Sequence, residues 1–381
     1  MYYFLLLCLV YMSGTIIYLL ALSLFGLRVV KDGPVDKEMT FNVIVPAHNE
    51  EAVIAGVINS IKNANYPAEK INVTMVADFC TDGTAAIARD LGCDVFERAS
   101  GARGKSAAVS EMIEKLRPSL GSSSVVVVFD ADNLVGKDFF ENMNRRLING
   151  ADVVQGNTGI HNWSQTVFTK LNHVNFAVTN RFKELARSQA GLSCRLRGHG
   201  MAFTVNAIDS VSWDASSLVE DQELTLKFVL AGFKVSWVHD AHVDSVIPAT
   251  AAEARVQRQR WAGGKSEVTS NAVSKLLTAA FKNKSLAAFD LAVDYIMVSY
   301  AVQLAITGLS LLLALFFLGY SNVLTLSLFA ISLVYFFYYL LASVLEGIRF
   351  GVFLCFFTAP VFIMWRLWIF VVSLRGAKAW H

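Results

Sequence analysis

Apolar residues are concentrated in two long segments near the ends of the chain. Neither Met1–Leu27 nor Tyr295–Leu345 contains a charged residue. Because a helix of about 20 apolar residues spans a bilayer, the first segment predicts one membrane helix. The second predicts two, joined by a turn at Gly319–Asn322. A cleaved signal peptide would have a basic start and a shorter apolar core, so we expect the first helix to be retained.

The basic residues after the first apolar segment predict the orientation of the chain. Arg28, Lys31 and Lys37 follow that segment. Excess Lys and Arg marks the cytoplasmic side of a membrane helix. We therefore expect a multi-pass integral membrane protein with its N-terminus outside and the middle of the chain in the cytoplasm. Residues 350–374 are also apolar but contain a proline and an arginine. We expect two short interfacial helices there, with a further full span, the fourth of the chain, as the alternative.

Between the apolar segments, from residue 40 to about 245, strand-like and helix-like patterns alternate. Short apolar runs predict strands at FNVIVPA, INVTMVAD, CDVFERA and SSVVVVFDAD. Helical spacing of apolar residues occurs between them, in EAVIAGVINSIKNA, TDGTAAIARDLG and SAAVSEMIEKL. The valines of the fourth strand predict burial on both faces. The alternation indicates an α/β fold with a mostly parallel, Rossmann-like sheet that helices cover on both sides.

Polar residues cluster where these predicted strands end. Ligands of open α/β sheets bind at the carboxyl ends of the strands. The residues at these ends are His48, Asn49, Glu50, Asp78, Arg103, Lys105, Asp130 and Asp132. The sequence therefore predicts a ligand site along this edge of the sheet.

The tripeptide Gly104-Lys105-Ser106 is similar to part of a nucleotide-binding P-loop. A complete P-loop has a glycine five residues before Gly104, and that residue is Ala99. Arg103 and Lys105 can still bind a pyrophosphate as charge-assisted donors. Arg103 and Lys105 therefore favour a nucleotide ligand, although the chain lacks a true P-loop. A membrane-associated P-loop-like nucleoside triphosphatase is the more distant alternative.

Asp130 and Asp132 form a D-x-D pair at the end of the valine-rich strand. Alternate side chains share one face of a strand, so both carboxylates point to one site. Two hard oxygen ligands beside phosphates suit Mg²⁺ or Mn²⁺. A turn or a helix cap uses the same residue types, so the pair alone leaves both interpretations open.

Two further segments contain candidate functional residues. Glu220 and Asp221 precede an amphipathic segment, where acids also serve simply as helix N-terminal residues. Gln257, Arg260 and Trp261 share one face of a predicted helix. Their amide, guanidinium and indole groups suit a phosphate and a sugar ring. A basic helix lying on lipid headgroups is the alternative.

Several motifs follow one another in a fixed order: VIVPAHNEE, ADFCTDGTA, RGKSAA, FDADN, RGHGMAF, VEDQEL and QRQRW. With them, residues 40 to about 265 resemble the membrane-integrated family-two glycosyltransferases of the D-D-D-QxxRW type. That group includes cellulose, hyaluronan, chitin and poly-N-acetylglucosamine synthases. The resemblance implies a GT-A fold and an inverting, metal-dependent transfer from a nucleotide-diphosphate sugar, usually a UDP-sugar.

The resemblance also implies roles for individual residues. Asp221 would be the general base, with Glu220 as its catalytic neighbour, and Asp78 would contact the nucleobase. Asp130 and Asp132 would hold the metal, Mg²⁺ or Mn²⁺, with Asp130 also facing the nucleotide. The other nucleotide-sugar contacts would be Pro46, His48, Glu50, Arg103, Lys105, Gln257 and Arg260, and the acceptor contacts would be His199, Gly200 and Trp261.

The chain departs from the usual pattern of this group in ways that bear on the acceptor. DFCTDGT replaces the commoner paired acids, and His199 stands where a small or hydroxyl residue is usual. Few membrane helices are predicted for a channel that secretes a polymer. We therefore expect transfer of one sugar to a saccharide or lipid-linked acceptor, with a processive β-polysaccharide synthase as the alternative. Export partners or a homo-oligomer are open, and the net charge of +2 gives no support for nucleic-acid binding.

These patterns divide the chain into parts. We expect a membrane helix at 1–28, a cytoplasmic GT-A domain at 29–250, QxxRW and amphipathic interfacial helices at 251–290, a membrane hairpin at 291–349, and interfacial helices with a cytoplasmic tail at 350–381. Val273, Leu276, Leu277, Ala280 and Phe281 form an apolar stripe near Lys275, Lys282 and Lys284. This stripe predicts a helix on an anionic leaflet, or a helix packed on the catalytic domain.

Overall fold

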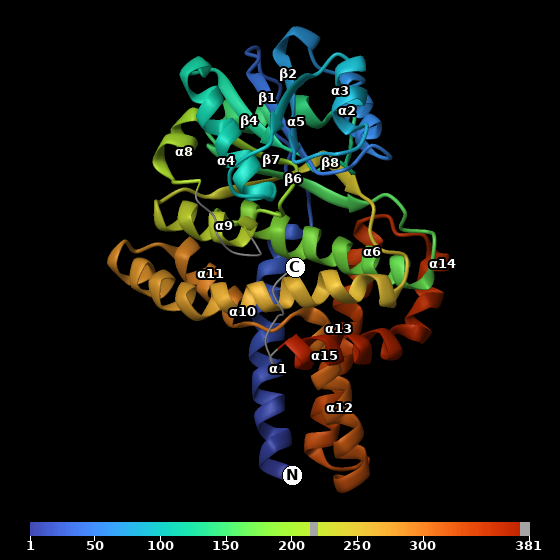
Figure 1. The fold of residues 1–381 in the computed structure, drawn as a ribbon. Helices are drawn as coiled ribbons and strands as arrows, with labels where there is room; N and C mark the ends of the chain where they lie inside the picture. Colours follow the sequence, from blue (N-terminus) through green and yellow to red (C-terminus); the bar gives the residue numbers. More distant parts are fainter. Residues whose placement is uncertain (214–219, 374–381) are drawn as a thin grey trace.

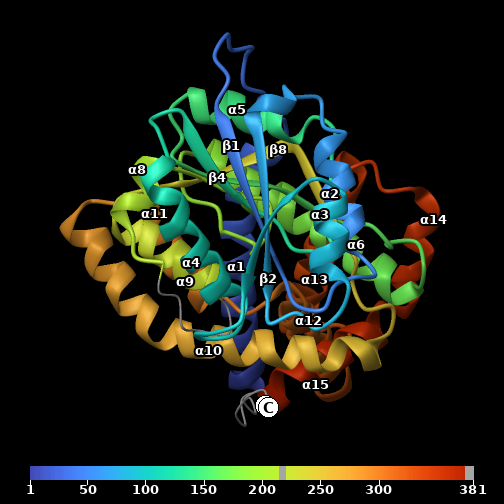
Figure 2. The ribbon, with the colours of Figure 1, turned by 45° about the horizontal axis from the view of Figure 1, so that its top comes forward.

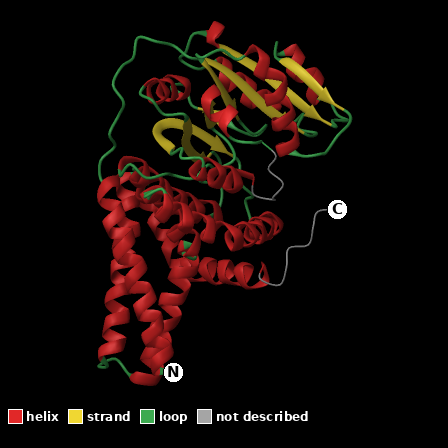
Figure 3. Cartoon of the chain, turned by 90° about the vertical axis from the view of Figure 1, so that its left-hand side faces the viewer, coloured by secondary structure: helices red, strands yellow, loops and turns green. Residues whose placement is uncertain are grey.

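The computed structural model describes residues 1–213 and 220–373 of the chain. Within these ranges, the side chains of residues 256–271 and of several residues from 350 onward are outside the description. Three layers are visible in Figures 1 and 3: a sheet with its helices, a group of helices lying crosswise, and a bundle of long helices that ends at the N-terminus.

The sheet has eight strands in the order β3-β2-β1-β4-β7-β6-β8-β5. The strands are β1 Thr40–Ala47, β2 Ile71–Asp78, β3 Asp94–Arg98, β4 Ser124–Val128, β5 Leu134–Val135, β6 Val153–Ile160, β7 Met201–Thr204 and β8 Val235–Ser245. The four strands predicted from the sequence are β1 to β4, and they pair in parallel. β7 is antiparallel to both β4 and β6, whereas β6 and β8 are parallel. The prediction of a mostly parallel α/β sheet is confirmed.

Helices cover both faces of the parallel half of the sheet, with α2 and α3 on one side and α4 and α8 on the other (Figure 2). These helices and their neighbours are α2 Ile54–Lys62, α3 Thr84–Asp90, α4 Lys105–Leu116, α5 Phe139–Ile148, α8 Val205–Ser210 and α9 Glu220–Leu230. Val125 and Val127 of β4 pack in the core with α2 and α5, and Val126 and Val128 pack in the core with α4 and α9. Burial on both faces explains the unbroken valines of β4.

Among the residues that the structure describes, three helices are long and apolar enough to cross a membrane: α1 Tyr2–Ser23 with the 3₁₀ turn that follows it, α12 Tyr300–Leu318 and α13 Val323–Leu345. They run together away from the sheet (Figures 1 and 3). Buried polar side chains join them, because Tyr335 donates a hydrogen bond to Gln303 and shares one with Thr15, each at 2.9 Å. Such bonds hold membrane helices together where burial of apolar surface gives no driving force. The helices lie where the sequence predicts a span and a hairpin. The number of membrane crossings and the orientation stay predictions.

The crosswise helices lie between the sheet and the bundle (Figure 1). They include α6 Val167–Thr179, α7 Ala186–Gln189, α10 Ala251–Lys282, α11 Leu286–Ile296, α14 Phe350–Phe353 and α15 Ala359–Ser373. A π-helical segment, Asn180–Leu185, joins α6 to α7. Short 3₁₀ helices span Leu24–Gly26, Ala68–Lys70, Arg117–Ser119 and Leu354–Thr358. α15 runs across the long helices and not along them (Figure 3).

The apolar stripe of α10 was predicted to contact lipid, but in the structure most of it contacts protein. Leu276 and Ala280 are buried in a cluster with Leu226 of α9 and Leu291 of α11. Only Phe281 at the end of the stripe is largely exposed. The stripe therefore packs on protein, which was the alternative. An amphipathic pattern shows that a face is covered but does not show whether protein or lipid covers it.

Candidate donor and acceptor site

Asp78, at the end of β2, connects the neighbouring loops at the edge of the sheet through an ion pair and hydrogen bonds. Its carboxylate forms a buried ion pair with Arg98 and accepts the Gly104 N–H at 2.7 Å. Its carbonyl oxygen lies 2.6 Å from His48 Nδ1. Gly104 has φ 110°, a conformation that favours glycine. Both carboxylate oxygens of Asp78 thus have protein partners, and its predicted contact with a nucleobase stays a prediction. Sequence reasoning missed Arg98, whose buried guanidinium also pairs with Glu111.

The other residues predicted from the first loops line the same edge. The Glu50 N–H donates to Thr84 Oγ1 at 2.8 Å, and the Arg103 guanidinium lies 4.5 Å from the centre of the Phe79 ring. Pro46 lies inside β1, where pairing with β4 has already stopped at Ile44. Proline has no N–H with which to continue a ladder. Pro46 therefore shapes the strand end.

Lys105, the first residue of α4, connects three elements of the site. Its Nζ lies 2.5 Å from Asp130 Oδ1, donates to the Gly198 carbonyl at 2.6 Å, and lies 3.8 Å from Glu220 Oε1. Burial lowers the pKa of Lys105, but Asp130, Glu220 and Asp221 outweigh it, so the pKa is above its ordinary value. A charged ammonium group therefore stands between the D-x-D pair and the start of α9.

Asp130 and Asp132 lie after the end of β4 at Val128, with Asp132 in a turn. The strand was predicted to include both residues, so the strand alternation expected to place both carboxylates on one face is wrong. Burial, and then the charge of Asp130, raises the pKa of Asp132 to about 6. Burial and the charge of Asp130 also raise the pKa of Glu50. Crowded carboxylates of this kind are stabilised by a divalent cation. In the part of the chain that the structure describes, no three His, Cys, Asp or Glu side chains form a ready metal cage. The pair thus fits a cation completed by ligand oxygens, as Mg²⁺ is commonly bound beside phosphates.

The RGHG loop is held from behind by Gln155, a fully buried side chain of β6. Gln155 Oε1 accepts the Arg197 N–H at 2.8 Å, and Nε2 donates to the His199 carbonyl at 2.9 Å. Gly198 and Gly200 have φ 85° and 63°, which a tight loop requires here. Sequence reasoning missed Gln155, because the residues that follow Val153 and Val154 in β6 are mostly polar or glycine and carry no clear strand pattern.

His199 Nδ1 lies 3.7 Å from Asp130 Oδ2, across the site from β4. Burial lowers the pKa of His199 to about 4 despite this carboxylate. The imidazole is therefore neutral near pH 7. The structure brings Lys105 and Asp130 together, as the shared edge of the sheet predicts, and also places His199 beside Asp130.

Asp221 lies in the first turn of α9, where Thr225 Oγ1 donates to its carbonyl and accepts the Leu196 N–H. Its Oδ1 accepts the Gln222 N–H at 2.8 Å. Burial, followed by the charge of Glu220, raises the pKa of Asp221 to about 6. A carboxylate whose pKa is near neutral is suited to general base catalysis.

Gln257, Arg260 and Trp261 fall within α10 by sequence position. Their side chains lie outside the described residues. Their shared face and their contacts with pyrophosphate and acceptor therefore stay predictions.

Comparisons with known proteins identify the family and the fold. The family described as Glycosyltransferase like family 2 matches residues 39–264. The chain is 28% identical over 264 residues to a β-monoglucosyldiacylglycerol synthase of Synechocystis sp., covering 64% of this chain and 54% of that protein. It is 25% identical over 252 residues to a poly-β-1,6-N-acetyl-D-glucosamine synthase of Staphylococcus aureus, covering 64% and 59%. The chain thus spans little more than half the length of these relatives.

A solved structure is similar over nearly the whole fold. It is the mannosyltransferase PcManGT from Pyrobaculum calidifontis, in complex with GDP-Man and Mn²⁺. The TM-score is 0.61 at 18% sequence identity, and the match covers 97% of this chain and 99% of that one. The similarity supports a GT-A-type sheet joined to apolar helices.

Proposed function

The chain belongs to glycosyltransferase-like family 2, and from this membership we propose that it transfers a sugar from a nucleotide-diphosphate sugar to an acceptor at the membrane. The observation that carries the proposal is the meeting of Lys105, Asp130 and Glu220 beside Asp221 at one edge of the sheet. This edge combines a cation for a diphosphate, a metal-binding pair and a base. We favour a UDP-sugar as the donor.

The donor diphosphate would lie against Arg103 and Lys105. Charge-assisted hydrogen bonds from such groups stabilise the negative charge that the leaving nucleotide diphosphate gains. Donor binding would draw Lys105 Nζ away from Asp130, to which it is bound here. Gln257 and Arg260 are proposed to border the same pyrophosphate.

Asp130 and Asp132 would hold a Mg²⁺ or Mn²⁺ ion. A bound divalent cation supplies positive charge at the leaving diphosphate. The solved structure of the similar mannosyltransferase contains Mn²⁺ and GDP-Man, which supports the proposal.

Asp221 is the proposed general base. An acceptor hydroxyl is a poor nucleophile at neutral pH, and a carboxylate within hydrogen-bond reach takes its proton as the oxygen attacks the anomeric carbon. The nucleotide diphosphate leaves from the opposite side with the bonding electron pair. One such displacement inverts the anomeric centre, so an α-linked donor gives a β-linked product. Neutral His199, with Gly200 and Trp261, would contact the acceptor.

The acceptor is proposed to be a lipid-linked or saccharide molecule that receives one sugar. A relative named as a glycolipid synthase and three apolar helices beside the catalytic sheet support this choice. We place the sheet on the cytoplasmic side, with the N-terminus outside. A processive synthase of the cellulose or chitin type stays the alternative.

The test is a donor panel. The full chain in bilayer nanodiscs is given UDP- and GDP-sugars, Mn²⁺ or Mg²⁺ and a lipid extract, and products are analysed by mass spectrometry. We expect one sugar donor to yield a glycolipid one sugar larger than its acceptor. Long polymer would show the processive alternative. ATP hydrolysis with no sugar transfer from any donor would overturn the proposal.

A further inference from the structure

α11 has an apolar stripe that no part of the described protein covers fully. Leu286, Phe289 and Ile296 are 75%, 46% and 58% exposed, and Val293 is half-buried. The spacing of three, four and three residues places all four on one face of the helix. Large apolar side chains gathered in this way mark a contact surface more often than scattered single ones do.

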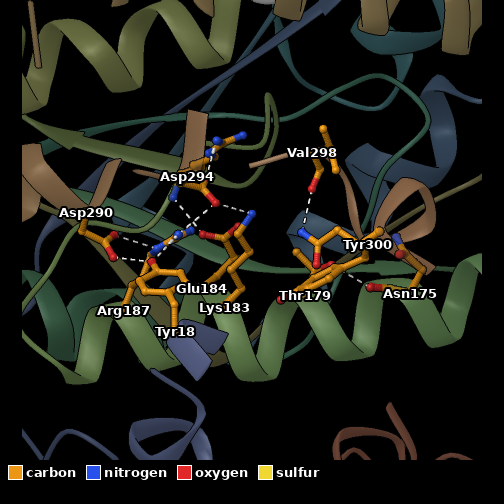
Figure 4. A network of polar contacts seen from close by, with 12 residues as sticks. Tyr18, Asn175, Thr179, Lys183, Glu184, Arg187, Asp290, Asp294, Val298 and Tyr300 are labelled. Carbon is orange, nitrogen blue, oxygen red and sulfur yellow. Dashed lines mark hydrogen bonds and ion pairs between the residues drawn. The ribbon is translucent and has the colours of Figure 1, made fainter. Parts of the chain in front are cut away.

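The buried side of α11 is fixed to the protein by ion pairs (Figure 4). Asp290 binds Arg187 at 2.8 Å, and Asp294 binds Arg187 at 2.9 Å and also pairs with Lys183 and Arg195. Turning the helix would leave these buried charges unpaired, which costs several kcal/mol. The apolar stripe therefore cannot rotate inward.

The stripe continues the surface of the long helices. Val293 packs against the cluster formed by α1, α6 and α13, and the Val298 N–H donates to Tyr11 of α1 at 3.3 Å. Figure 1 shows α10 and α11 crosswise at the end of the bundle nearest the sheet. From Ile296 to Leu286 the stripe thus runs outward from the bundle, at the level where a bilayer surface would lie.

Basic residues adjoin the outer end of this stripe. Lys282 is exposed at the end of α10, Lys284 is exposed in the connection to α11, and Lys275 is exposed about two turns earlier on α10. Phe281, beside them, is 78% exposed. Apolar side chains next to lysines suit a leaflet that contains anionic lipids.

We propose that the stripe Leu286, Phe289, Val293 and Ile296, with Phe281, Lys282 and Lys284, forms a second membrane contact that lies in an anionic leaflet. This role was predicted for α10, and the structure assigns it to α11. The contact also reaches the catalytic side, because Tyr295 on the buried face donates to the Gln222 carbonyl at 3.2 Å. Gln222 adjoins the proposed base, Asp221.

The test uses an environment-sensitive fluorophore on Phe289→Cys, in the full chain with its five native cysteines replaced. The protein is placed in nanodiscs containing phosphatidylglycerol, with or without nitroxide-labelled lipid. We expect a blue-shifted emission and strong loss of intensity on nitroxide quenching. Leu312→Cys, on an exposed position of α12, is the positive control, and Glu114→Cys, exposed on α4, is the negative control.

The charge is tested by Lys282→Gln with Lys284→Gln in the labelled chain. We expect this pair to reduce quenching in discs with phosphatidylglycerol and to have no effect in phosphatidylcholine alone. Quenching at Phe289→Cys no greater than at Glu114→Cys would overturn the proposal. So would a blue shift that appears only when two chains share a disc, since that indicates a second copy on the stripe. Nucleotide-sugar binding, measured in the same samples, keeps this outcome separate from a failure of the proposed function.

Discussion

The raised pKa of Asp221 predicts a strong loss of activity in mild acid. With a pKa of about 6, the carboxylate is mostly ionised near pH 7 and mostly protonated near pH 5. Only the ionised form accepts a proton, so kcat/KM should fall about tenfold between these values. A carboxylate with an ordinary pKa near 4 would give an almost flat profile over this range.

The cause of the shift can be tested by changing one neighbour. Glu220 raises the pKa of Asp221, after burial. Glu220→Gln should therefore move the acid limb to lower pH, by roughly half a unit to one unit for a neighbouring charge. Glu223→Gln, one turn along α9 where Glu223 binds Lys227 at 3.2 Å, is the matched control and should leave the limb in place.

The assay measures initial rates of transfer between about pH 5 and pH 8, because the whole predicted limb lies within that range. Asp132 also has a pKa of about 6, so the profile is repeated at low and saturating Mn²⁺. A metal competes with protons for its ligands; a limb due to Asp132 therefore shifts with Mn²⁺, whereas one due to Asp221 does not. A flat acid profile at saturating Mn²⁺, or an unmoved limb in Glu220→Gln, would refute the reasoning.

Three further predictions concern stability, the loop and the metal. Burial raises the pKa of Asp294, but Arg187, Arg195 and Lys183 hold it well below the ordinary value. The ionised Asp294 therefore stabilises the folded protein above about pH 4, and this contribution is lost only in stronger acid. Asp294→Asn should lower the free energy of unfolding at neutral pH by about 3–5 kcal/mol, whereas Glu141→Gln, which breaks the surface pair with Arg145, should cost less than about 1 kcal/mol; equal melting temperatures would contradict this. Gly200→Ala places Cβ 2.6 Å from Val243 Cγ1 at φ 63° and should lower both the melting temperature and the activity. Gly191→Ala, at φ 71° with no atom within 4 Å of its Cβ, is the control and should have only a small effect. Similar losses in both variants would show that backbone strain at positive φ matters and the contact with Val243 does not. Asp132→Ala should abolish Mn²⁺-dependent donor binding in calorimetry, and undiminished transfer by the wild type in excess EDTA would show that no metal is needed.

The local pattern of the sequence was sufficient for the parallel half of the fold. The valines of β4 predicted a strand buried on both faces, but the strand ends at Val128 and the D-x-D pair lies after it, not within it. The insertion of β7 between β4 and β6 could not be predicted. It depends on pairing between strands that are distant in the sequence, and a short strand such as MAFT carries no mark of its partners.

Residues missed by sequence reasoning are polar groups whose partners are remote. Gln155 bonds to a loop about 40 residues away in the chain, and Asp294 pairs with Arg187 about 100 residues away. A charged or amide residue is usually exposed, so nothing in the local pattern indicates its burial. The stripe of α10 was assigned to lipid for a related reason: periodicity does not identify what covers an apolar face.

The central claim is that Asp221 removes the acceptor proton during glycosyl transfer. The most direct test compares the wild type with Asp221→Asn, which removes the basicity and keeps the shape of the side chain. Transfer should fall by about 100-fold or more, while the affinity for the nucleotide-sugar donor, measured by calorimetry in nanodiscs, stays unchanged. Near-normal turnover of Asp221→Asn would contradict the account, because another group would then have to accept the proton.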